Sequence, residues 1–190
     1  MTPRSALPGI LLVLASAILF STKSIFIKLG YREAVDPVTL LTLRMLLSLP
    51  FFVAMGLWAS RGEARAPLTR RDWTALAALG IGGYYLAALL DFLGLQYISA
   101  GLERLVLFLY PTFTVLITAL WLKRPVTRRT WIAIAISYAG MALVVWPDLQ
   151  HSSRGLFLGT TLVLGSALTY AVYLVGSGEM IPRLGANRFT

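Results

Sequence analysis

Long runs without a charged residue constrain the fold of this chain more than any other feature. A helix of about 20 apolar residues crosses the ~30 Å hydrocarbon layer of a membrane, and uncharged runs close to that length recur along the chain. They cover residues 5–22, 73–90, 105–122, 130–147 and 155–178. We therefore predict an all-α, polytopic transmembrane helical bundle with six spans, near residues 7–29, 38–59, 73–96, 99–122, 130–147 and 156–178.

The composition argues against several functional classes. Only 13% of the residues carry charge, against about 25% in soluble proteins. The chain has no cysteine and one histidine, His151, so thiol nucleophiles and zinc sites built from these residues lack their ligands. The motifs of metalloproteases, serine hydrolases and phosphate-binding loops are also missing. We expect no enzyme activity, no cofactor and no metal.

The basic residues indicate the orientation of the chain in the membrane. One set of alternating connections holds 11 Lys and Arg residues and the other set holds three. The 11 are Arg4, Arg61, Arg65, Arg70, Arg71, Lys123, Arg124, Arg128, Arg129, Arg183 and Arg188. Because cytoplasmic loops collect Lys and Arg, we predict a multi-pass protein of the cell inner membrane with a cytoplasmic N-terminus. The net charge of +9 then faces lipid headgroups, and we expect no nucleic-acid partner.

The chain resembles itself at an offset of 150 residues. Residues 12–17 read Leu-Val-Leu-Ala-Ser-Ala and residues 162–167 read Leu-Val-Leu-Gly-Ser-Ala, while Arg4 and Gly9 align with Arg154 and Gly159. Five predicted helices separate the two copies, so the second copy enters the membrane from the opposite side. This pattern is typical of the inverted repeats of secondary transporters, although an apolar stretch can also match by chance. It predicts one whole repeat followed by the first helix of a second.

Short motifs in order along the chain resemble the EamA type of the drug/metabolite transporter superfamily. They are Phe-Ser-Thr-Lys-Ser-Ile-Phe-Ile-Lys at 20–28, Leu43-Arg44-Met45, Leu-Tyr-Pro-Thr-Phe at 109–113, and the segments 127–131 and 139–141. The resemblance implies ten helices in two five-helix repeats, with 8–147 as the first repeat and 155–190 as the incomplete start of the second. It also implies export of amino acids or other small metabolites by alternating access. One departure is Leu122-Lys123-Arg124, where the family often has Leu-Gly-Glu.

Five charged residues lie inside the predicted spans and form the core of a candidate substrate site. They are Lys23, Arg44, Asp91, Glu103 and Arg104. Charges in a membrane usually face a bundle interior or a wet cavity. At 1.5 Å per residue, Lys23, Arg44, Asp91 and Arg104 lie about 10 Å below the outer surface. Three interpretations stay open: a structural ion pair between Asp91 and Arg104, an outward vestibule with a net charge of +1 that suits an anion, and snorkelling to the interface.

Tyrosines at mid-span supply a second layer of candidates, because a buried phenol without a partner is costly. Tyr85 and Tyr110 complete the candidate site, although core packing is the simpler role for any one of the mid-span tyrosines 84, 85, 110, 138, 170 and 173. Pro111 should kink the fourth span. Gly80, Gly82 and Gly83 should allow close approach or bending in the third.

Two functions from different classes follow from these patterns. The first is a carrier with a small-molecule substrate in a lipid bilayer, in which Asp91 or Glu103 could carry a coupling proton. The second is a non-transporting membrane scaffold or an inactive fragment of a ten-helix transporter, because the second repeat is incomplete. A homodimer or a missing second repeat would then be the partner, and a membrane enzyme is a third alternative.

Overall fold

The computed structural model describes residues 7–60, 68–123, 125–149, 154–185 and 189. All regular structure in these ranges is helical, which confirms the predicted all-α bundle. Several residues of the sequence analysis fall outside the described ranges: Arg4, Arg61, Arg65, Arg124, His151 and Arg188.

The first two spans are continuous helices, α1 (Leu7–Arg32) and α2 (Pro37–Ser60). The third combines α3 (Arg70–Ala77), a π-helix η2 (Ala78–Tyr85) and α4 (Leu86–Leu95). The fourth consists of α5 (Ala100–Leu107) and α6 (Tyr110–Trp121). The helices α7 (Arg128–Leu149) and α8 (Arg154–Leu184) follow.

In the described part of the chain, five helical segments are long and apolar enough to cross a membrane: Leu7–Arg32, Pro37–Trp58, Arg70–Leu95, Ala100–Trp121 and Gly155–Pro182. They coincide with the predicted spans one to four and six. The fifth predicted span, 130–147, lies within the 22-residue helix α7, which is not among these five, so its membrane crossing stays a prediction.

Polar caps begin the helices that follow short connections. The carboxylate of Asp36 accepts a 3.0 Å hydrogen bond from the backbone N–H of Thr39 at the start of α2, and these contacts with Thr39 lower the pKa of Asp36 below its ordinary value. Thr69 and Asp72 form a reciprocal capping box on α3. Caps of this kind satisfy backbone donors that the first turn of a helix leaves free.

The interruptions of the third and fourth spans occur where the sequence predicts them. The break between α5 and α6 covers Phe108 and Leu109 and directly precedes Tyr110 and Pro111, because proline lacks the N–H that would continue the α-helical ladder. The π-helix contains three of the four glycines of the third span, Gly80, Gly82 and Gly83. Of these, Gly83 lies against another helix, since a Cβ atom there would come within 2.8 Å of Tyr173.

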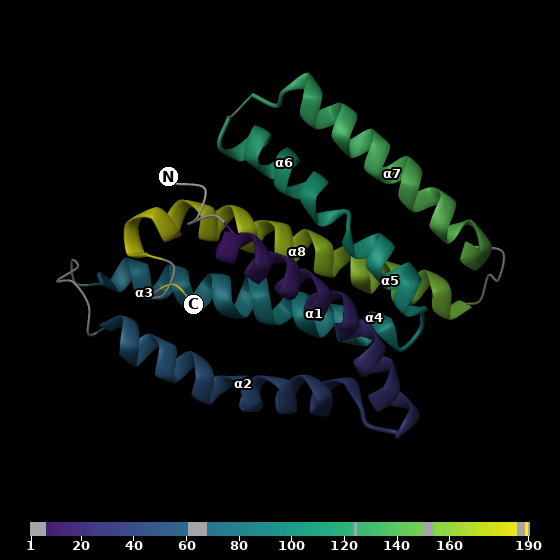
Figure 1. Ribbon diagram of the computed structural model, residues 1–190, viewed down its shortest axis with the longest axis horizontal. Coiled ribbons are helices and arrows are strands. Elements are labelled where there is room, and N and C mark those ends of the chain that lie inside the picture. The colour runs from purple at the N-terminus through teal and green to yellow at the C-terminus, as the bar shows by residue number, and fades with distance from the viewer. Residues whose placement is uncertain (1–6, 61–67, 124, 150–153, 186–188, 190) are drawn as a thin grey trace.

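Helix α8 packs along η2 and α4 of the third span, and glycines bring the backbones together. A Cβ atom on Gly94 would lie 2.5 Å from Val163 and 2.9 Å from the carbonyl of Gly159. A Cβ atom on Gly176 would lie 2.5 Å from Leu79 at the other end of α8. Small residues allow such close helix packing in membranes. In Figure 1, α8 also runs in the direction opposite to α1, as an inverted repeat requires.

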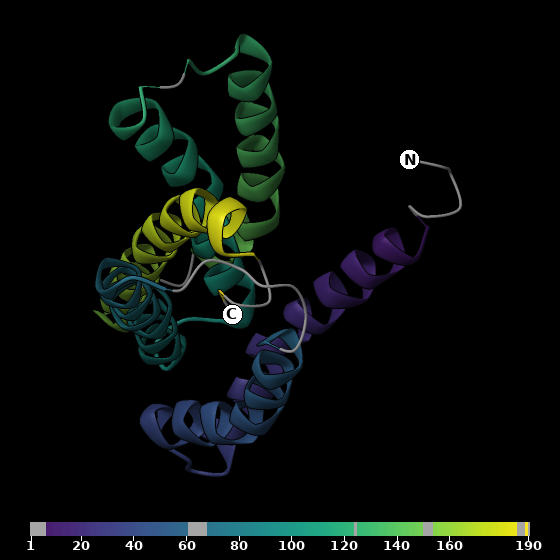
Figure 2. The same cartoon turned by 90° about the vertical axis from the view of Figure 1, so that its left-hand side faces the viewer.

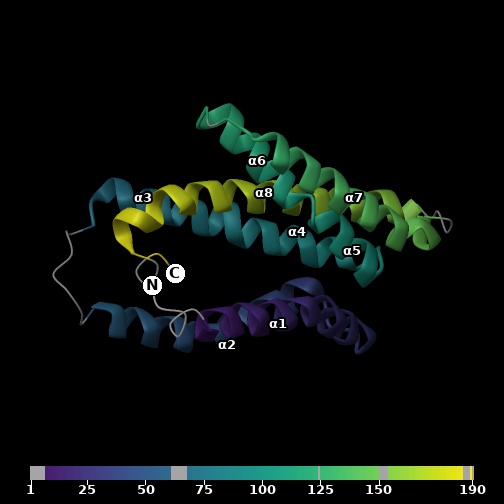
Figure 3. The ribbon, with the colours of Figure 1, turned by 45° about the horizontal axis from the view of Figure 1, so that its top comes forward.

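Helices α1 and α2 form a separate layer beneath α3, α4 and α8, as Figures 2 and 3 show. An apolar cluster of Ile27, Leu41, Phe92 and Leu95 joins this layer to α4. A second cluster joins α5 to α8 and consists of Ile98, Leu102, Val106, Leu107, Val163 and Ala167. Outward side chains such as Leu12 and Phe51 are 71% and 77% exposed, a surface suited to lipid. The candidate site lies between the two layers.

Candidate functional site

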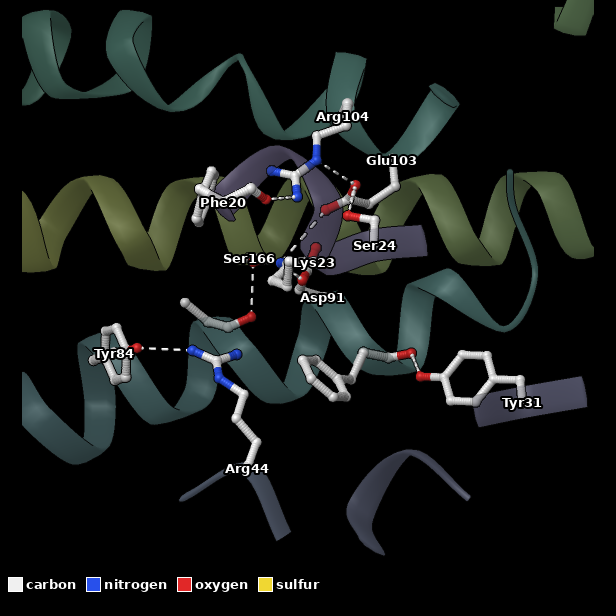
Figure 4. Close-up of polar contacts among 12 residues, drawn as sticks. Phe20, Lys23, Ser24, Tyr31, Arg44, Tyr84, Asp91, Glu103, Arg104 and Ser166 are labelled. Atoms are coloured by element: carbon white, nitrogen blue, oxygen red, sulfur yellow. Dashed lines mark hydrogen bonds and ion pairs between the residues drawn. The ribbon is translucent and has the colours of Figure 1, made fainter. Parts of the chain in front are cut away.

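Four charged side chains from three spans meet between α1, α4 and α5 (Figure 4). Lys23 forms an ion pair with Asp91, and its Nζ lies 3.7 Å from Oε1 of Glu103. Nε of Arg104 lies 3.4 Å from Oε2 of Glu103. The guanidinium of Arg104 also donates a hydrogen bond to the backbone carbonyl of Phe20 on α1. We call Lys23, Asp91, Glu103 and Arg104 the charge cluster.

Glu103 lies at the centre of the charge cluster, and its residue is 0% exposed. Besides the two cations, it accepts a 2.7 Å hydrogen bond from the hydroxyl of Ser24. Two cations and two carboxylates compensate one another formally, which limits the cost of placing charge inside the bundle. Three buried atoms of the cluster nevertheless have no hydrogen-bond partner among the described residues: Oδ1 of Asp91, Oε1 of Glu103 and Nε of Arg104.

The ion pairs differ from the pairing that equal depth suggested. One of the three interpretations of the sequence paired Asp91 with Arg104, whereas the structure pairs Asp91 with Lys23 and Arg104 with Glu103. Depth along a helix does not determine which way a side chain points around the helix. The rotations of α1 and α5 bring Lys23 and Glu103 into the cluster and change the partners.

Arg44 on α2 stands apart from the charge cluster. Its Nη2 donates a 2.8 Å hydrogen bond to the hydroxyl of Tyr84, and its Cζ lies 5.8 Å from the centre of the Phe92 ring. None of the described carboxylates forms a salt bridge with Arg44. Arg44 is therefore a cation inside a predicted span whose charge has no partner of opposite sign among the described residues.

A first cavity of about 240 Å³ lies beside Arg44 and the charge cluster. Its lining residues are Phe20, Lys23, Arg44, Tyr84, Ala87, Ala88, Asp91, Leu107, Ser166 and Tyr170. They come from α1, α2, the third and fourth spans, and α8. Ser166 is held in place by a 2.7 Å hydrogen bond that it donates to the carbonyl of Ala87. The first cavity thus combines a cation, hydroxyl groups and aromatic rings.

A second cavity of about 400 Å³ lies along α1 and shares three residues with the first, Phe20, Leu107 and Tyr170. The rest of its lining is Val13, Ser16, Ala17, Ser21, Arg104, Phe108 and Tyr110. Phe20 lines both cavities. The centre of its ring lies 4.5 Å from Cζ of Arg104 and 5.5 Å from Nζ of Lys23. Cation–π contacts of this kind hold the ring against the charge cluster.

The predicted site residues fall into three groups. Lys23, Arg44 and Asp91 line the first cavity, and Arg104 and Tyr110 line the second. Glu103 lines neither cavity and is buried beneath its partners.

Tyr85 lines neither of these two cavities and is 39% exposed. Its neighbour Tyr84 contacts Arg44 instead. Because η2 is a π-helix, with more residues per turn than an α-helix, spacing in the sequence alone could not choose between the two tyrosines.

The site residues predicted from the sequence did not include several residues that line the two cavities. The ring of Tyr170 packs edge-to-face against Tyr110 with their centres 5.2 Å apart, and the ring of Tyr84 lies 5.6 Å from that of Tyr173. Both Tyr84 and Tyr170 were mid-span tyrosines, so burial of the phenol was the signal available for them. Phe20 belongs to the motif at 20–28, and Ser166 to the repeated segment at 162–167. Nothing in the sequence pointed to Leu107.

In the described ranges, no group of three or more His, Asp or Glu residues could hold a metal ion. The charge cluster and the two cavities supply ion pairs, hydroxyl groups and aromatic faces. Such groups bind and orient a small molecule by hydrogen bonds and ring contacts.

The sequence profile of the EamA-like transporter family matches residues 7–146. The chain belongs to the EamA-like transporter family. The match covers spans one to four and most of α7, and it includes every residue of the charge cluster and Arg44. This places the chain among multi-pass membrane proteins of the transporter class.

Curated relatives of this EamA-like chain carry transporter names. It is 30% identical to the uncharacterized transporter YcbK of Bacillus subtilis, over 97% of the chain and 59% of the relative. An uncharacterized transporter of Archaeoglobus fulgidus is 29% identical over 90% of the chain and 57% of the relative. The chain thus spans a little over half the length of these two relatives. No solved structure matches it.

Proposed function

We propose that the chain is a carrier unit that moves a small metabolite, of the amino-acid or metabolite export type, through the inner membrane by alternating access. The observation that carries this proposal is the pair of adjoining cavities beside a buried charge cluster in a bundle of membrane-length helices. The positive-inside pattern favours a cytoplasmic N-terminus. Residues 8–147 would form the first repeat and 155–190 the start of the second.

The packing of the two layers supports a rocking motion. Glycines bring α8 close to the third span at both ends, so these helices resist separation. The layer of α1 and α2 meets them through side chains instead: the pair of Lys23 and Asp91, the bond of Arg44 to Tyr84, and a 2.6 Å hydrogen bond from Tyr31 to the carbonyl of Phe92. Both cavities lie at this boundary, so a rocking of α1 and α2 would change access to them.

A flux measurement in proteoliposomes tests the carrier. Vesicles that contain the purified chain would be loaded with a mixture of labelled amino acids and organic acids, and the efflux of each would be followed. We expect saturable efflux of at least one solute and its loss in Arg44→Ala and Arg104→Ala. Arg32→Ala is the matched control, because Arg32 is an exposed arginine at the end of α1. Flux that neither saturates nor responds to the two substitutions would reject a carrier.

The alternative function is a non-transporting scaffold or an inactive fragment. The chain spans 59% of the relative from Bacillus subtilis, and a homodimer or a separate second repeat could be needed to complete a transport unit. A monodisperse chain without efflux and without thermal stabilisation by any solute of the mixture would favour this alternative.

A further inference from the structure

We infer that Arg44 and Tyr84 form the subsite for the carboxylate of the transported molecule, a monoanionic organic acid with an apolar or ring-shaped body. This inference rests on the proposed carrier function and names the class of its substrate. It follows from the distribution of charge, from the free hydrogen-bonding capacity of the two side chains, and from the shape of the adjoining space.

The charge distribution singles out Arg44. Lys23 and Arg104 are each paired with a carboxylate of the charge cluster, whereas Arg44 forms no salt bridge with any described residue. A guanidinium inside a membrane-spanning bundle is costly to leave without a partner. A bound anion would supply the negative charge that Arg44 lacks. Because only one cation is uncompensated, a monoanion fits better than a dianion.

The geometry of the two side chains suits a carboxylate. A guanidinium has five N–H donors in a planar fork that matches the two oxygens of a carboxylate, and Arg44 uses Nη2 for its bond to Tyr84. The Tyr84 hydroxyl accepts that bond, so its own O–H can donate to a ligand oxygen. The ring of Phe92, with its centre 5.8 Å from Cζ, adds a cation–π contact to the guanidinium.

The lining of the first cavity indicates the chemistry of the rest of the ligand. The first cavity also contains the Lys23–Asp91 ion pair and Ser166. The rest of its lining is Ala87, Ala88, Leu107, Tyr170 and Phe20, and Phe20 also lines the second cavity. These surfaces match an aliphatic chain or an aromatic ring. A volume of about 240 Å³ accommodates a small acid of this kind. The carboxylates of Asp91 and Glu103 attract a cationic ligand only weakly, because each is already paired with Lys23 or Arg104.

Binding of three probes that share the phenylpropyl skeleton and differ in the terminal group tests the inference with the purified chain. The probes are 3-phenylpropionate, 3-phenylpropionamide and 3-phenylpropylamine, measured by calorimetry in a neutral detergent, with empty micelles as the blank. We expect the acid to bind most tightly. Arg44→Gln should weaken the binding of the acid by roughly 10- to 100-fold, because it removes a charge-assisted hydrogen bond. Tyr84→Phe should weaken it by about 3- to 10-fold.

Matched variants show whether a loss is specific. Arg32→Gln should leave the binding of the acid unchanged, and Arg44→Lys should recover part of it. Circular dichroism and size exclusion establish that each variant is folded, and Tyr84→Phe provides the test if Arg44→Gln does not fold. Equal binding of acid and amide, tighter binding of the amine, or a folded Arg44→Gln protein that binds the acid like the unaltered chain would each overturn the inference.

The same binding assay in nanodiscs separates a solute from a lipid headgroup. We expect phosphatidylglycerol not to compete with the acid, and competition would assign Arg44 to the headgroup and overturn the inference. Failure of the inference and failure of the carrier are distinguishable. Arg44-dependent binding without efflux would reject the carrier alone, whereas saturable efflux that does not depend on Arg44 would reject the carboxylate subsite.

Discussion

The hydroxyl of Ser24 on α1 donates a 2.7 Å hydrogen bond to the carboxylate of Glu103 on α5, and both residues are buried. This bond connects the first and fourth spans at the centre of the charge cluster. It gives the layer of α1 and α2 a defined register against the rest of the bundle, because a buried carboxylate is costly unless its oxygens are hydrogen-bonded.

Removal of this hydroxyl should destabilise the bundle. Ser24→Ala takes one partner from a buried carboxylate, and we expect a loss of about 1–3 kcal/mol in the free energy of unfolding. Unfolding by SDS titration in mixed micelles measures the change. Ser21→Ala is the control, because Ser21 is exposed and its hydroxyl bonds only to the carbonyl of Ala17 one turn earlier. Equal stability of both variants would contradict the role of the bond.

Breaking one side of the Lys23–Asp91 pair should cost more than removing both sides. Asp91→Asn leaves Lys23 without its nearest counter-charge, and we expect a loss of about 3–5 kcal/mol. Lys23→Met combined with Asp91→Asn removes both charges and should recover most of that loss. The same SDS titration gives the four stabilities of a double-mutant cycle. Additive effects of the two single substitutions would show that the pair does not couple the layers.

The glycine contacts of α8 predict a position-dependent response to alanine. Gly159→Ala places a Cβ atom 2.7 Å from Ile98 and 3.0 Å from the carbonyl of Gly94, and overpacking of this kind costs about 1–3 kcal/mol. Gly178→Ala on the same helix meets no atom within 4 Å and should be neutral or slightly stabilising. Thermal unfolding followed by circular dichroism compares the two. A similar melting temperature for both variants would show that close packing at Gly159 is not required.

Filling either cavity should block efflux without unfolding the protein. Ala88→Phe occupies the first cavity and Ala17→Phe the second, and we expect each to reduce saturable efflux by at least about tenfold, since displaced substrate loses its contacts. Ala142→Phe on α7 adds the same ring at an exposed position and should leave the efflux rate unchanged. Undiminished efflux in both cavity variants would place the pathway elsewhere.

The cap at the start of α2 predicts a pH dependence in the acid range. Hydrogen bonds from Thr39 lower the pKa of Asp36, so the charged form stabilises the folded state. That contribution is present above the unfolded pKa of about 3.9 and is lost as the pH falls through the lower folded pKa. Carbon-13 NMR of the Asp36 carboxyl should give a midpoint below about 3.9. Asp36→Asn keeps the cap but should remove this pH dependence, whereas a midpoint at or above the ordinary value would contradict the cap.

Several features of the fold could be predicted from local patterns. The positions of the spans followed from uncharged runs such as 73–90 and 155–178, because insertion into a membrane depends mainly on the hydrophobicity of each segment. The break before Pro111 followed from the missing N–H of proline. The five charges inside the spans could be named as candidates because charge inside a span is costly wherever it lies.

The arrangement of the site could not be predicted in the same way. The sequence placed Asp91 and Arg104 at equal depth, but their partners in the structure are Lys23 and Glu103. It favoured Tyr85 for the candidate set, but the π-helix turns Tyr84 towards Arg44. Both differences arise from rotation about a helix axis, which depth along the membrane does not specify.

What the sequence by itself determined was the class of the protein, the approximate extent of its spans and the inventory of charges inside them, since each depends on the residues of one segment. Only the tertiary structure decided which charges neutralise one another, that Arg44 has no counter-charge among the described residues, and that two cavities adjoin at Phe20. These features depend on contacts between helices that are distant in the chain, such as those of α1 with α4 and α5. The physical reason is that hydrophobicity acts segment by segment, whereas ion pairing and cavity shape depend on the packing of several helices together.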